Sequence, residues 1–448
     1  MHRLFLITVA LTLVLVSAPP ASAVAPPAID PGAMPPDVTG PDQPLEQKRV
    51  CKAPLTLPAS NFRDPPWPNT YLGIAQAQKF ATGAGVTVAV IDTGIDASPR
   101  VPAEPGGDFV VPDGDGLSDC DAHGTLTASI IAGRPTLTDG FVGVAPDARL
   151  VSERQTSEAW EPKDSQNNQN DPNATPAAGS IRSLARAVVH AANLGAGVIN
   201  ISEAACFKVK KPVDESSLGA ALNYAVNVKG AVIVVAAGNV GGDCSQNPPP
   251  DPSIPADPRG WQGVQTIVTP AWYAPLVLTV GGVDQDGAPS EFSMHGPWVG
   301  VAAAADNIIA LGPHGEPVDA LPGKEGPVPI AGTSFAAAYV SGLAALLRQR
   351  FPDLGPAQII NRITATARHP GGGVDNAVGA GIIDAVAALT WDVPAGSEAT
   401  TFPVQRIQPP VPVPGPDHGP ITIVALSVAG LILALALAAL TARALRRH

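Results

Sequence analysis

The chain has 448 residues and a formal net charge of −12, and its basic residues form no cluster before the last six positions. An acidic chain without a basic stretch argues against nucleic acid as a partner, and we expect none. Once the terminal segments described below are set aside, about 350 residues remain, which is enough for one large buried core.

The N-terminal segment predicts export from the cytoplasm. His2 and Arg3 precede an apolar stretch, and a run of small residues ending at Ala23 follows it as a cleavage site. We therefore expect residues 1–23 to be a signal peptide. Residues 24–69 form a proline-rich N-terminal extension, and we expect its residues 24–50 to lie extended against the surface. It is too short to fold as an independent inhibitory domain, so we expect it to stay attached.

The first strong element is a strand at 86–92, a valine-rich run that suits a parallel strand buried on both faces. Asp92 ends this run, and Thr93 and Gly94 follow at once. A carboxylate at the carboxyl end of a buried strand lies where open α/β sheets place their sites. Asp92 could orient a histidine there; the alternative is that it only caps a turn or a helix.

A helix is predicted over 123–132, with His123 at its start and Gly124 and Thr125 directly after it. In this place one ring nitrogen could stay free for a nucleophile. The alternative is a surface histidine that caps the helix. The preceding segment, 108–121, is acidic, and we expect a solvated loop. A calcium site is the less favoured interpretation, because the segment lacks the ligand spacing of an EF-hand.

The middle of the chain alternates between strands and helices. Residues 153–178 interrupt it as a polar insertion, which we expect to be mobile and sensitive to proteases. Residues 243–275 form a second, proline-rich insertion. A buried strand leads to Asn239 between the two. The elements predicted here are a strand near 148–152, a helix at 179–194, a strand at 197–201, a helix at 216–229, and strands at 231–237 and 276–281.

Ser334 opens a long apolar helix, 334–350, directly after Gly332 and Thr333. The N-terminus of a helix supplies unpaired N–H groups and a partial positive charge, which stabilise the oxyanion formed in acyl transfer. Ser334 could instead be only an N-cap, and the two interpretations are compatible. A last helix is predicted over 355–367. The alternation predicts an α/β fold with a mainly parallel sheet and helices on both faces.

The C-terminal part predicts a membrane anchor. Residues 396–420 are a proline-rich linker, which we expect to be semi-rigid. Residues 421–442 carry no charge and are long enough to span a bilayer as one transmembrane helix. Arginines follow at once, so the positive-inside rule places residues 443–448 in the cytoplasm. We therefore expect a single-pass protein of the cell membrane whose catalytic domain lies on the extracytoplasmic side.

Four cysteines, Cys51, Cys120, Cys206 and Cys244, lie in the part that we expect to be exported. An even number in an oxidising compartment predicts two disulfides, for which three pairings are possible. A zinc site is the alternative, but no CxxC spacing supports it. We expect neither a metal nor another cofactor.

Three segments carry the strongest signal: VAVIDTGID, DAHGTLTASIIAG and GTSFAAAYVSGLAALL. They place Asp92, His123 and Ser334 in the chain order Asp…His…Ser, and Asn239 follows a strand ending in AAG. With this order the chain resembles the subtilisin-like serine proteases of the peptidase S8 family, over roughly residues 70–390. We expect the catalytic domain at 70–395.

The resemblance implies a role for each of these residues. Asp92 would orient His123, His123 would take the proton of Ser334, and the amide of Asn239 would donate to the oxyanion. The substrates would be proteins or peptides. One departure concerns Ser202-Glu203-Ala204, where many subtilisins carry Ser-Leu-Gly, so the shape of the primary specificity pocket stays open.

Within that family the chain is most similar to the mycosins, membrane-anchored proteases of mycobacterial type VII secretion systems. The similarity rests on the signal peptide, the proline-rich extension with its cysteine, GTSFAA in place of GTSMAAP, and the C-terminal membrane helix. It implies the disulfides Cys51–Cys120 and Cys206–Cys244. It also implies a type VII secretion membrane complex as a partner.

We therefore expect a membrane-anchored serine endopeptidase that acts on proteins exported by a type VII system. The alternative is mainly a structural component of the secretion complex, with proteolysis secondary. The membrane anchor disfavours a broad degradative exoprotease. A catalytically dead homologue is disfavoured too, because every triad position is filled.

Overall fold

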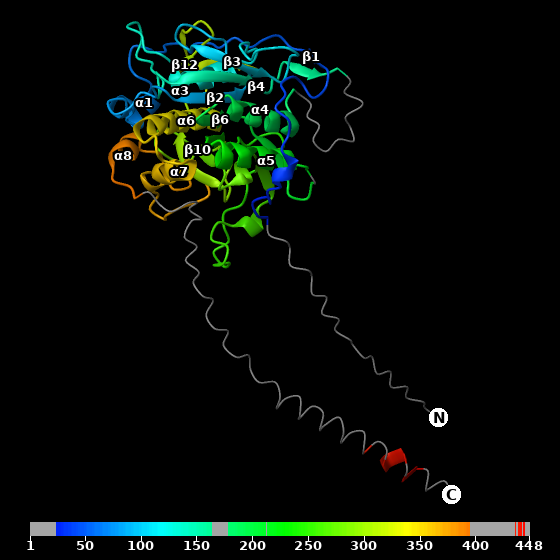
Figure 1. Cartoon of the computed structure of the whole chain (residues 1–448). Coiled ribbons are helices and arrows are strands. Elements are labelled where there is room, and N and C mark those ends of the chain that lie inside the picture. Colours follow the sequence, from blue (N-terminus) through cyan, green and yellow to red (C-terminus); the bar gives the residue numbers. More distant parts are fainter. Residues whose placement is uncertain are drawn as a thin grey trace. The chain divides into compact units, whose positions relative to one another are not determined.

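A seven-stranded sheet, parallel throughout, organises the globular part of the chain (Figure 1). The computed structural model describes residues 24–163, 178–211 and 213–394, together with 435, 438–440, 442 and 443. The strand order is β11-β10-β8-β6-β2-β4-β3, which confirms the predicted parallel sheet. The strands are β2 (Thr87–Asp92), β3 (Ala103–Asp108), β4 (Arg149–Arg154), β6 (Val198–Ile201), β8 (Val232–Ala236), β10 (Leu278–Val283) and β11 (Val299–Ala304).

Both faces of the sheet are buried, because successive side chains of a strand point to opposite faces and these strands are apolar on both. Val88 and Val90 of β2 belong to one core cluster, whereas Ala89 and Ile91 belong to the other. Helices therefore cover each face, as predicted, which makes this an α/β fold. One face carries α3 (His123–Ala132) and α6 (Thr333–Arg350), and the other carries α4 (Ile181–Asn193) and α5 (Ser216–Asn223).

Each strand and helix predicted between residues 86 and 367 is found, although α5 ends earlier than expected. It stops at Asn223, and Tyr224–Val228 continue it as a π-helical turn. The sequence did not predict β3 or β11. Pro105 lies within β3, and the sheet tolerates it because β3 is an edge strand. The remaining helices are α1 (Trp67–Tyr71), α2 (Ile74–Ala77), α7 (Pro356–Ala365) and α8 (Ala385–Thr390).

In the described part of the chain, four two-stranded ladders lie outside the main sheet, and all are antiparallel. They pair β1 (Leu45–Gln47) with β5 (Trp160–Pro162), β7 (Ala205–Lys208) with β9 (Thr266–Thr269), β12 (Ala310–Leu311) with β13 (Pro317–Val318), and β14 (Ala320–Gly323) with β15 (Gly326–Pro329).

The first of these ladders corrects the prediction of a mobile insertion at 153–178. Strand β1 of the N-terminal extension pairs with β5 inside that insertion, and the side chains of Gln155, Ser157 and Ala159 are buried. The extension supplies the partner strand, which is why the local sequence gave no sign of order. Residues 164–177 lie outside the described part of the chain.

The prediction of a solvated acidic loop at 108–121 is wrong for three of its carboxylates. Asp108, Asp119 and Asp121 are buried. Each of them accepts hydrogen bonds from the protein: Asp108 from the two backbone N–H groups at 110 and 111, and Asp121 from the hydroxyl of Ser157. Such bonds offset the cost of removing a carboxylate from water.

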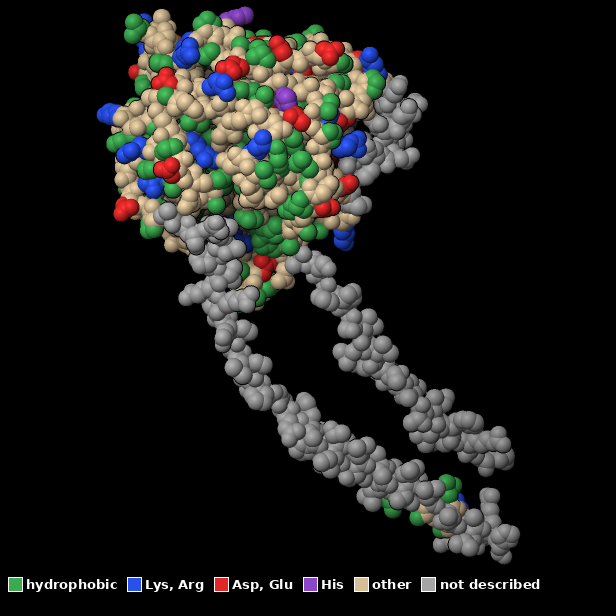
Figure 2. All heavy atoms as spheres, in the orientation of Figure 1, with side chains coloured by type: hydrophobic (Ala, Val, Ile, Leu, Met, Phe, Trp, Pro, Cys, Tyr) green, Lys and Arg blue, Asp and Glu red, His purple; other side chains and the backbone are tan. Residues whose placement is uncertain are grey.

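The two terminal predictions fall almost entirely outside the described residues. These are the signal peptide at 1–23 and the membrane span at 421–442. Within the described residues, no helix is both long and apolar enough to cross a membrane. Residues 1–400 and 401–448 form separate units, and the few described positions of the second are helical. On the face drawn in Figure 2, acidic and basic side chains of the globular part are interspersed.

The strand order reverses at β2, and this positions the site. From β2 the chain builds β3 and β4 on one side, and it then returns to place β6 on the other. In open α/β sheets, ligands bind outside the carboxyl ends of the strands at such a switch point. Asp92 ends β2, Ser202 follows β6, and Asn239 lies shortly after β8.

Candidate active site

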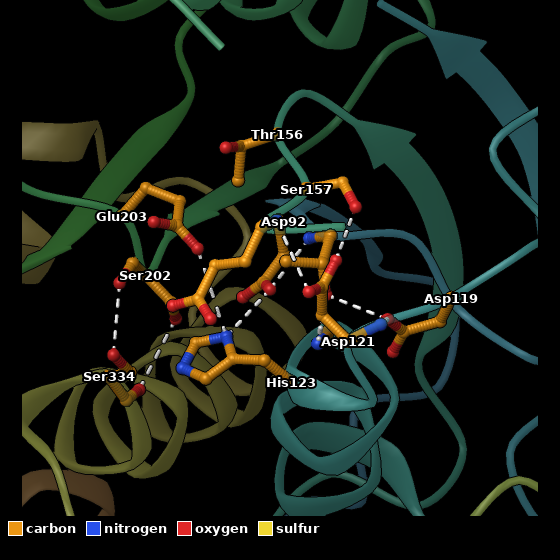
Figure 3. Close-up of polar contacts among 12 residues, drawn as sticks. Asp92, Asp119, Asp121, His123, Thr156, Ser157, Ser202, Glu203 and Ser334 are labelled. Carbon is orange, nitrogen blue, oxygen red and sulfur yellow. Dashed lines mark hydrogen bonds and ion pairs between the residues drawn. The ribbon is translucent and has the colours of Figure 1, made fainter. Parts of the chain in front are cut away.

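Asp92 and His123 form a hydrogen-bonded pair at this edge of the sheet (Figure 3). Asp92 is the last residue of β2 and fully buried, and His123 is the first residue of α3. His123 Nδ1 lies 2.7 Å from Asp92 Oδ1. Gly124 permits this approach, because a Cβ there would lie 2.1 Å from the carbonyl oxygen of Gly94. Only glycine lets the start of α3 come so close to the turn after β2.

The charge of Asp92 controls the protonation of His123. Burial by itself would lower the pKa of His123, but the negative charge of Asp92 and its hydrogen bond outweigh that effect. Together with smaller contributions from Glu203 and Asp119, they raise the pKa of His123 to about 10. A histidine whose imidazolium is stabilised in this way is a strong base once it has lost its proton.

Ser334 lies in the first turn of α6, as predicted, with Gly332 as N-cap. Its side chain is buried, and its Oγ donates to the backbone carbonyl of Ser202 at 3.0 Å. Figure 3 shows the second ring nitrogen of His123 on the side of Ser334. Among the described residues, the hydroxyl is thus held by the backbone carbonyl of Ser202.

Asn239 lies close to the start of α6. Its Oδ1 accepts hydrogen bonds from the backbone N–H of Thr333 at 3.0 Å and from the Thr333 hydroxyl at 3.1 Å. Because the oxygen of the amide is held, its Nδ2 is the group left to donate. Asn239 and Ser334 line the same cleft, so two kinds of donor can face it: the side-chain amide of Asn239 and the backbone N–H of Ser334 at the start of α6.

The cleft has a volume of about 360 Å³ and is lined from several segments. His123, Ser202, Glu203 and Ser334 lie on it. Further lining comes from the N-terminal extension and the segment after β4, where Lys52 and Glu158 form an ion pair. The cleft is therefore bordered by the extension as well as by the sheet.

The disulfides tie segments next to this site. Cys51 pairs with Cys120, three residues before His123, and Cys206 pairs with Cys244. This is the pairing that the mycosin resemblance implies. The first bond fastens the extension beside the start of α3, and the second fastens the segment after Asn239 to β7.

Two acidic residues near the site, Asp119 and Glu203, were not predicted from the sequence to be functional residues. Asp119 accepts hydrogen bonds from the hydroxyls of Thr93 and Thr125, at 2.8 and 2.7 Å, and so ties the turn after β2 to the start of α3. Burial raises its pKa to about 6. Thr93 directly follows Asp92 and Thr125 lies two residues after His123 in the sequence. These two hydroxyls could have indicated that a carboxylate joins the two segments. Glu203 lies with its carboxylate beside the Asp92–His123 pair (Figure 3).

Among the described residues, the side chains of Asp92, His123 and Glu203 form the group that could hold a metal ion. Ligand atoms of Asp92, His123 and Glu203 lie within 4.8 Å of one another. A metal at Nδ1 would have to displace the proton shared with Asp92. Because the pKa of His123 is raised to about 10, that proton competes strongly at neutral pH.

Comparison with known proteins identifies the family. Residues 83–381 match the family model described as Subtilase family. The chain belongs to the subtilase family. Within it the chain groups with the mycosins: it is 77% identical over 448 residues to Mycosin-1 of Mycobacterium tuberculosis, covering 100% of both chains. This subtilase is therefore a serine protease of the subtilisin type, as predicted.

Solved structures agree with the subtilase fold. A crystal structure of MycP1 from the ESX-1 type VII secretion system is 72% identical, has a TM-score of 0.83, and covers 85% of this chain and 100% of its own. A chain in the structure of an intact ESX-5 inner membrane complex is 44% identical, with a TM-score of 0.80. It covers 94% of this subtilase and 100% of its own length.

Proposed function

We propose that this chain is a membrane-anchored serine endopeptidase that uses Asp92, His123 and Ser334 to cleave proteins exported by a type VII secretion system. The observation that carries the proposal is the 2.7 Å hydrogen bond between Asp92 and His123, in a cleft that Ser334 lines from the N-terminus of α6. This hydrogen bond disfavours the alternative interpretations, in which Asp92 only caps a turn or a helix and His123 is a surface residue that caps a helix.

The reaction would begin when the Ser334 hydroxyl leaves the carbonyl of Ser202 and donates to Nε2 of His123. As Oγ attacks the peptide carbonyl carbon, His123 takes the hydroxyl proton, and Asp92 stabilises the resulting imidazolium. The negative charge moves to the carbonyl oxygen, where Nδ2 of Asn239 and the backbone N–H of Ser334 can donate hydrogen bonds.

The collapse of this intermediate breaks the C–N bond. His123 gives its proton to the leaving amine and leaves an acyl-enzyme on Ser334. Water then attacks the ester with His123 as base, which releases the acid and restores the hydroxyl. These steps are supported by the lining of the cleft, to which His123, Asn239 and Ser334 all contribute.

Labelling with a fluorophosphonate probe tests the triad directly. The full-length chain in detergent should be labelled, and Ser334→Ala should lose the label. Ser216→Ala is the matched control, because Ser216 also opens a helix, α5, but does not line the cleft. Persistent labelling of Ser334→Ala would show that another residue is the nucleophile. If the folded wild type takes no label, the triad is not assembled for catalysis.

A structural role is the second candidate, and the similarity to a chain of the ESX-5 inner membrane complex favours it. Cells that carry only Ser334→Ala separate the two functions. If type VII secretion continues in these cells, the chain acts mainly through assembly of the complex. If secretion stops while the complex still forms, proteolysis is required.

The membrane anchor is part of the proposal and has its own test. We infer that residues 421–442 span the membrane once, with 443–448 in the cytoplasm and the catalytic domain outside. The support is the uncharged run followed by arginines. A single cysteine placed in the 443–448 tail should resist an impermeant thiol reagent in intact cells, and its rapid modification there would contradict this topology.

A further inference from the structure

Glu203 places a second carboxylate next to the ring nitrogen that Asp92 holds. Its Oε1 lies 3.9 Å from His123 Nδ1, and 35% of its side chain is exposed to the cleft. Glu203 follows Ser202, which accepts the hydroxyl of Ser334, so its backbone belongs to the segment that fixes the nucleophile. In Figure 3 the carboxylates of Asp92 and Glu203 both lie close to His123.

The other charged groups around His123 are engaged elsewhere. Asp119, before α3, is buried and takes hydrogen bonds from two threonines, and Asp121 accepts from the hydroxyl of Ser157. Glu158, after β4, forms an ion pair with Lys52 of the extension. Among the described residues, the one ion pair that Glu203 forms is with His123, and no hydrogen bond neutralises its carboxylate.

We propose that Glu203 is a positioning residue that, with Asp92, holds His123 as the imidazolium in the resting enzyme and thereby sets the pH at which the catalytic base becomes available. This inference rests on the proposed function, because it assigns the base to His123. It differs from that function in naming a residue outside the triad. Glu203 touches the base and does not itself take or give a proton in the reaction.

Electrostatics gives the effect its sign and its window. An opposite charge within about 4–6 Å raises the pKa of a base by roughly 1–3 units. Burial raises the pKa of Glu203 itself, the charge of Asp92 adds to this, and His123 opposes it, which leaves a pKa of about 7. Below this pH Glu203 is protonated and contributes little. Above it, Glu203 is ionised and retains the proton of His123 until the pH approaches 10.

The variant Glu203→Gln keeps the shape of the side chain and removes its charge. We expect His123 to lose its proton at a pH about 1–3 units lower than in the wild type. At neutral pH a larger fraction of the enzyme then carries the free base, so the rate of fluorophosphonate labelling should rise. At alkaline pH the labelling rate should be equal or lower, because the base is weaker. A purely structural defect would lower labelling at every pH and leave the midpoint unchanged.

The protonation of His123 can be measured without proteolysis. Of the two forms of histidine, diethyl pyrocarbonate acylates the neutral imidazole and not the imidazolium. Mass spectrometry of the peptide that contains His123 therefore gives a rate for this residue at each pH. We expect the rate at pH 8 to be about 10-fold or more higher in Glu203→Gln than in the wild type, both as full-length chains in detergent. Glu203→Asp retains the charge and should restore most of the wild-type profile.

Glu158→Gln is the matched control, since Glu158 lines the same cleft but is already paired with Lys52. It should change the His123 profile far less than Glu203→Gln. Equal profiles for Glu203→Gln and the wild type, or equal shifts in both Gln variants, would overturn the inference. If Glu203→Gln shifts the His123 profile but the wild type takes no fluorophosphonate label, the inference about Glu203 holds and the proposed function fails. If the wild type is labelled but Glu203→Gln causes no shift, the proposed function holds and the inference about Glu203 fails.

Discussion

The hydroxyl of Ser334 donates to the backbone carbonyl of Ser202 at 3.0 Å, and the hydroxyl of Ser202 donates in turn to the carbonyl of Ser334 at 3.3 Å. This reciprocal pair fastens the first turn of α6 to the segment after β6. Ser202 also accepts a hydrogen bond from the buried amide of Asn200 at 2.8 Å. The position of the Ser334 side chain therefore depends on a small polar network formed by Asn200, Ser202 and Ser334.

Ser202→Ala should reduce stability more than activity. The backbone carbonyl that holds Ser334 remains, but Nδ2 of Asn200 loses its acceptor inside the core. An orphaned buried donor costs about 1–3 kcal/mol, so we expect a loss of that size in the free energy of unfolding. Urea unfolding of the full-length chain measures it. The exposed Ser253→Ala should stay within about 0.5 kcal/mol, and a Ser202→Ala chain that is equally stable would refute the network.

Asn239→Ala should slow the chemical step. The amide donor to the oxyanion is lost, and removal of one such donor costs about 2.7–4 kcal/mol of transition-state stabilisation in subtilisin. We expect kcat on a peptide ester to fall roughly 10²–10³-fold with KM little changed. The variant also loses the acceptor for Thr333. Thermal unfolding must therefore show an intact fold, and an unchanged kcat would exclude Asn239 from the oxyanion site.

The places of Asp92, His123, Asn239 and Ser334 in the fold were predictable because the sequence next to each of them has a clear strand or helix pattern. Asp92, His123 and Asn239 all lie at the end of an apolar strand or at the start of a helix, and Ser334 opens a run of helix-forming residues. The strands between them have strong apolar patterns. The alternation of strands and helices predicts a parallel sheet, which explains why these four residues lie at one edge of it.

The rest depends on contacts between distant segments, which a single sequence does not show. Strand β5 is ordered because β1 of the extension pairs with it, more than a hundred residues away in the sequence. Asp119 looks like a loop carboxylate, yet it is buried by the hydroxyls of Thr93 and Thr125. Glu203 stood out only as a departure from a familiar tripeptide, and its distance to His123 requires the folded chain.

The rate of labelling at Ser334 should rise with pH through the neutral range. The base must be neutral to accept the proton, and Asp92 raises the pKa of His123 to about 10, with Glu203 adding to it. We expect the rate to increase about tenfold per pH unit until it levels off near that value. A rate that already reaches its plateau near pH 7 would show that His123 is neutral there.

The same shift predicts how stability depends on pH. The folded pKa of His123 lies above the unfolded value of about 6.5. Its stabilising contribution is therefore fully present below about pH 6.5 and is lost as the pH rises toward 10. Asp92→Asn should weaken this dependence and lower the labelling rate by roughly 10⁴-fold, because the amide favours the wrong tautomer of His123. Urea unfolding of the wild type and of Asp92→Asn at several pH values measures how the free energy of unfolding depends on pH.

Loss of the Cys51–Cys120 disulfide should destabilise the fold more than loss of Cys206–Cys244. The first bond joins residues 69 apart in the sequence and the second residues 38 apart. In the chain-entropy account each bond contributes about 4 kcal/mol, and the longer loop adds about 0.5 kcal/mol. Serine pairs at each bond, compared by urea unfolding, measure the difference.

A second readout locates the effect of the Cys51–Cys120 bond. Without it the extension is still held by the β1–β5 ladder and by the hydrogen bond from the backbone N–H of Lys52 to the carbonyl of Cys120 at 2.8 Å. We therefore expect limited proteolysis to cut first near residues 48–60 in the serine pair, while the wild type resists. Because this segment borders the cleft through Lys52, fluorophosphonate labelling should change in the same variant. Unaltered proteolysis and labelling would show that the ladder alone fixes the extension beside His123.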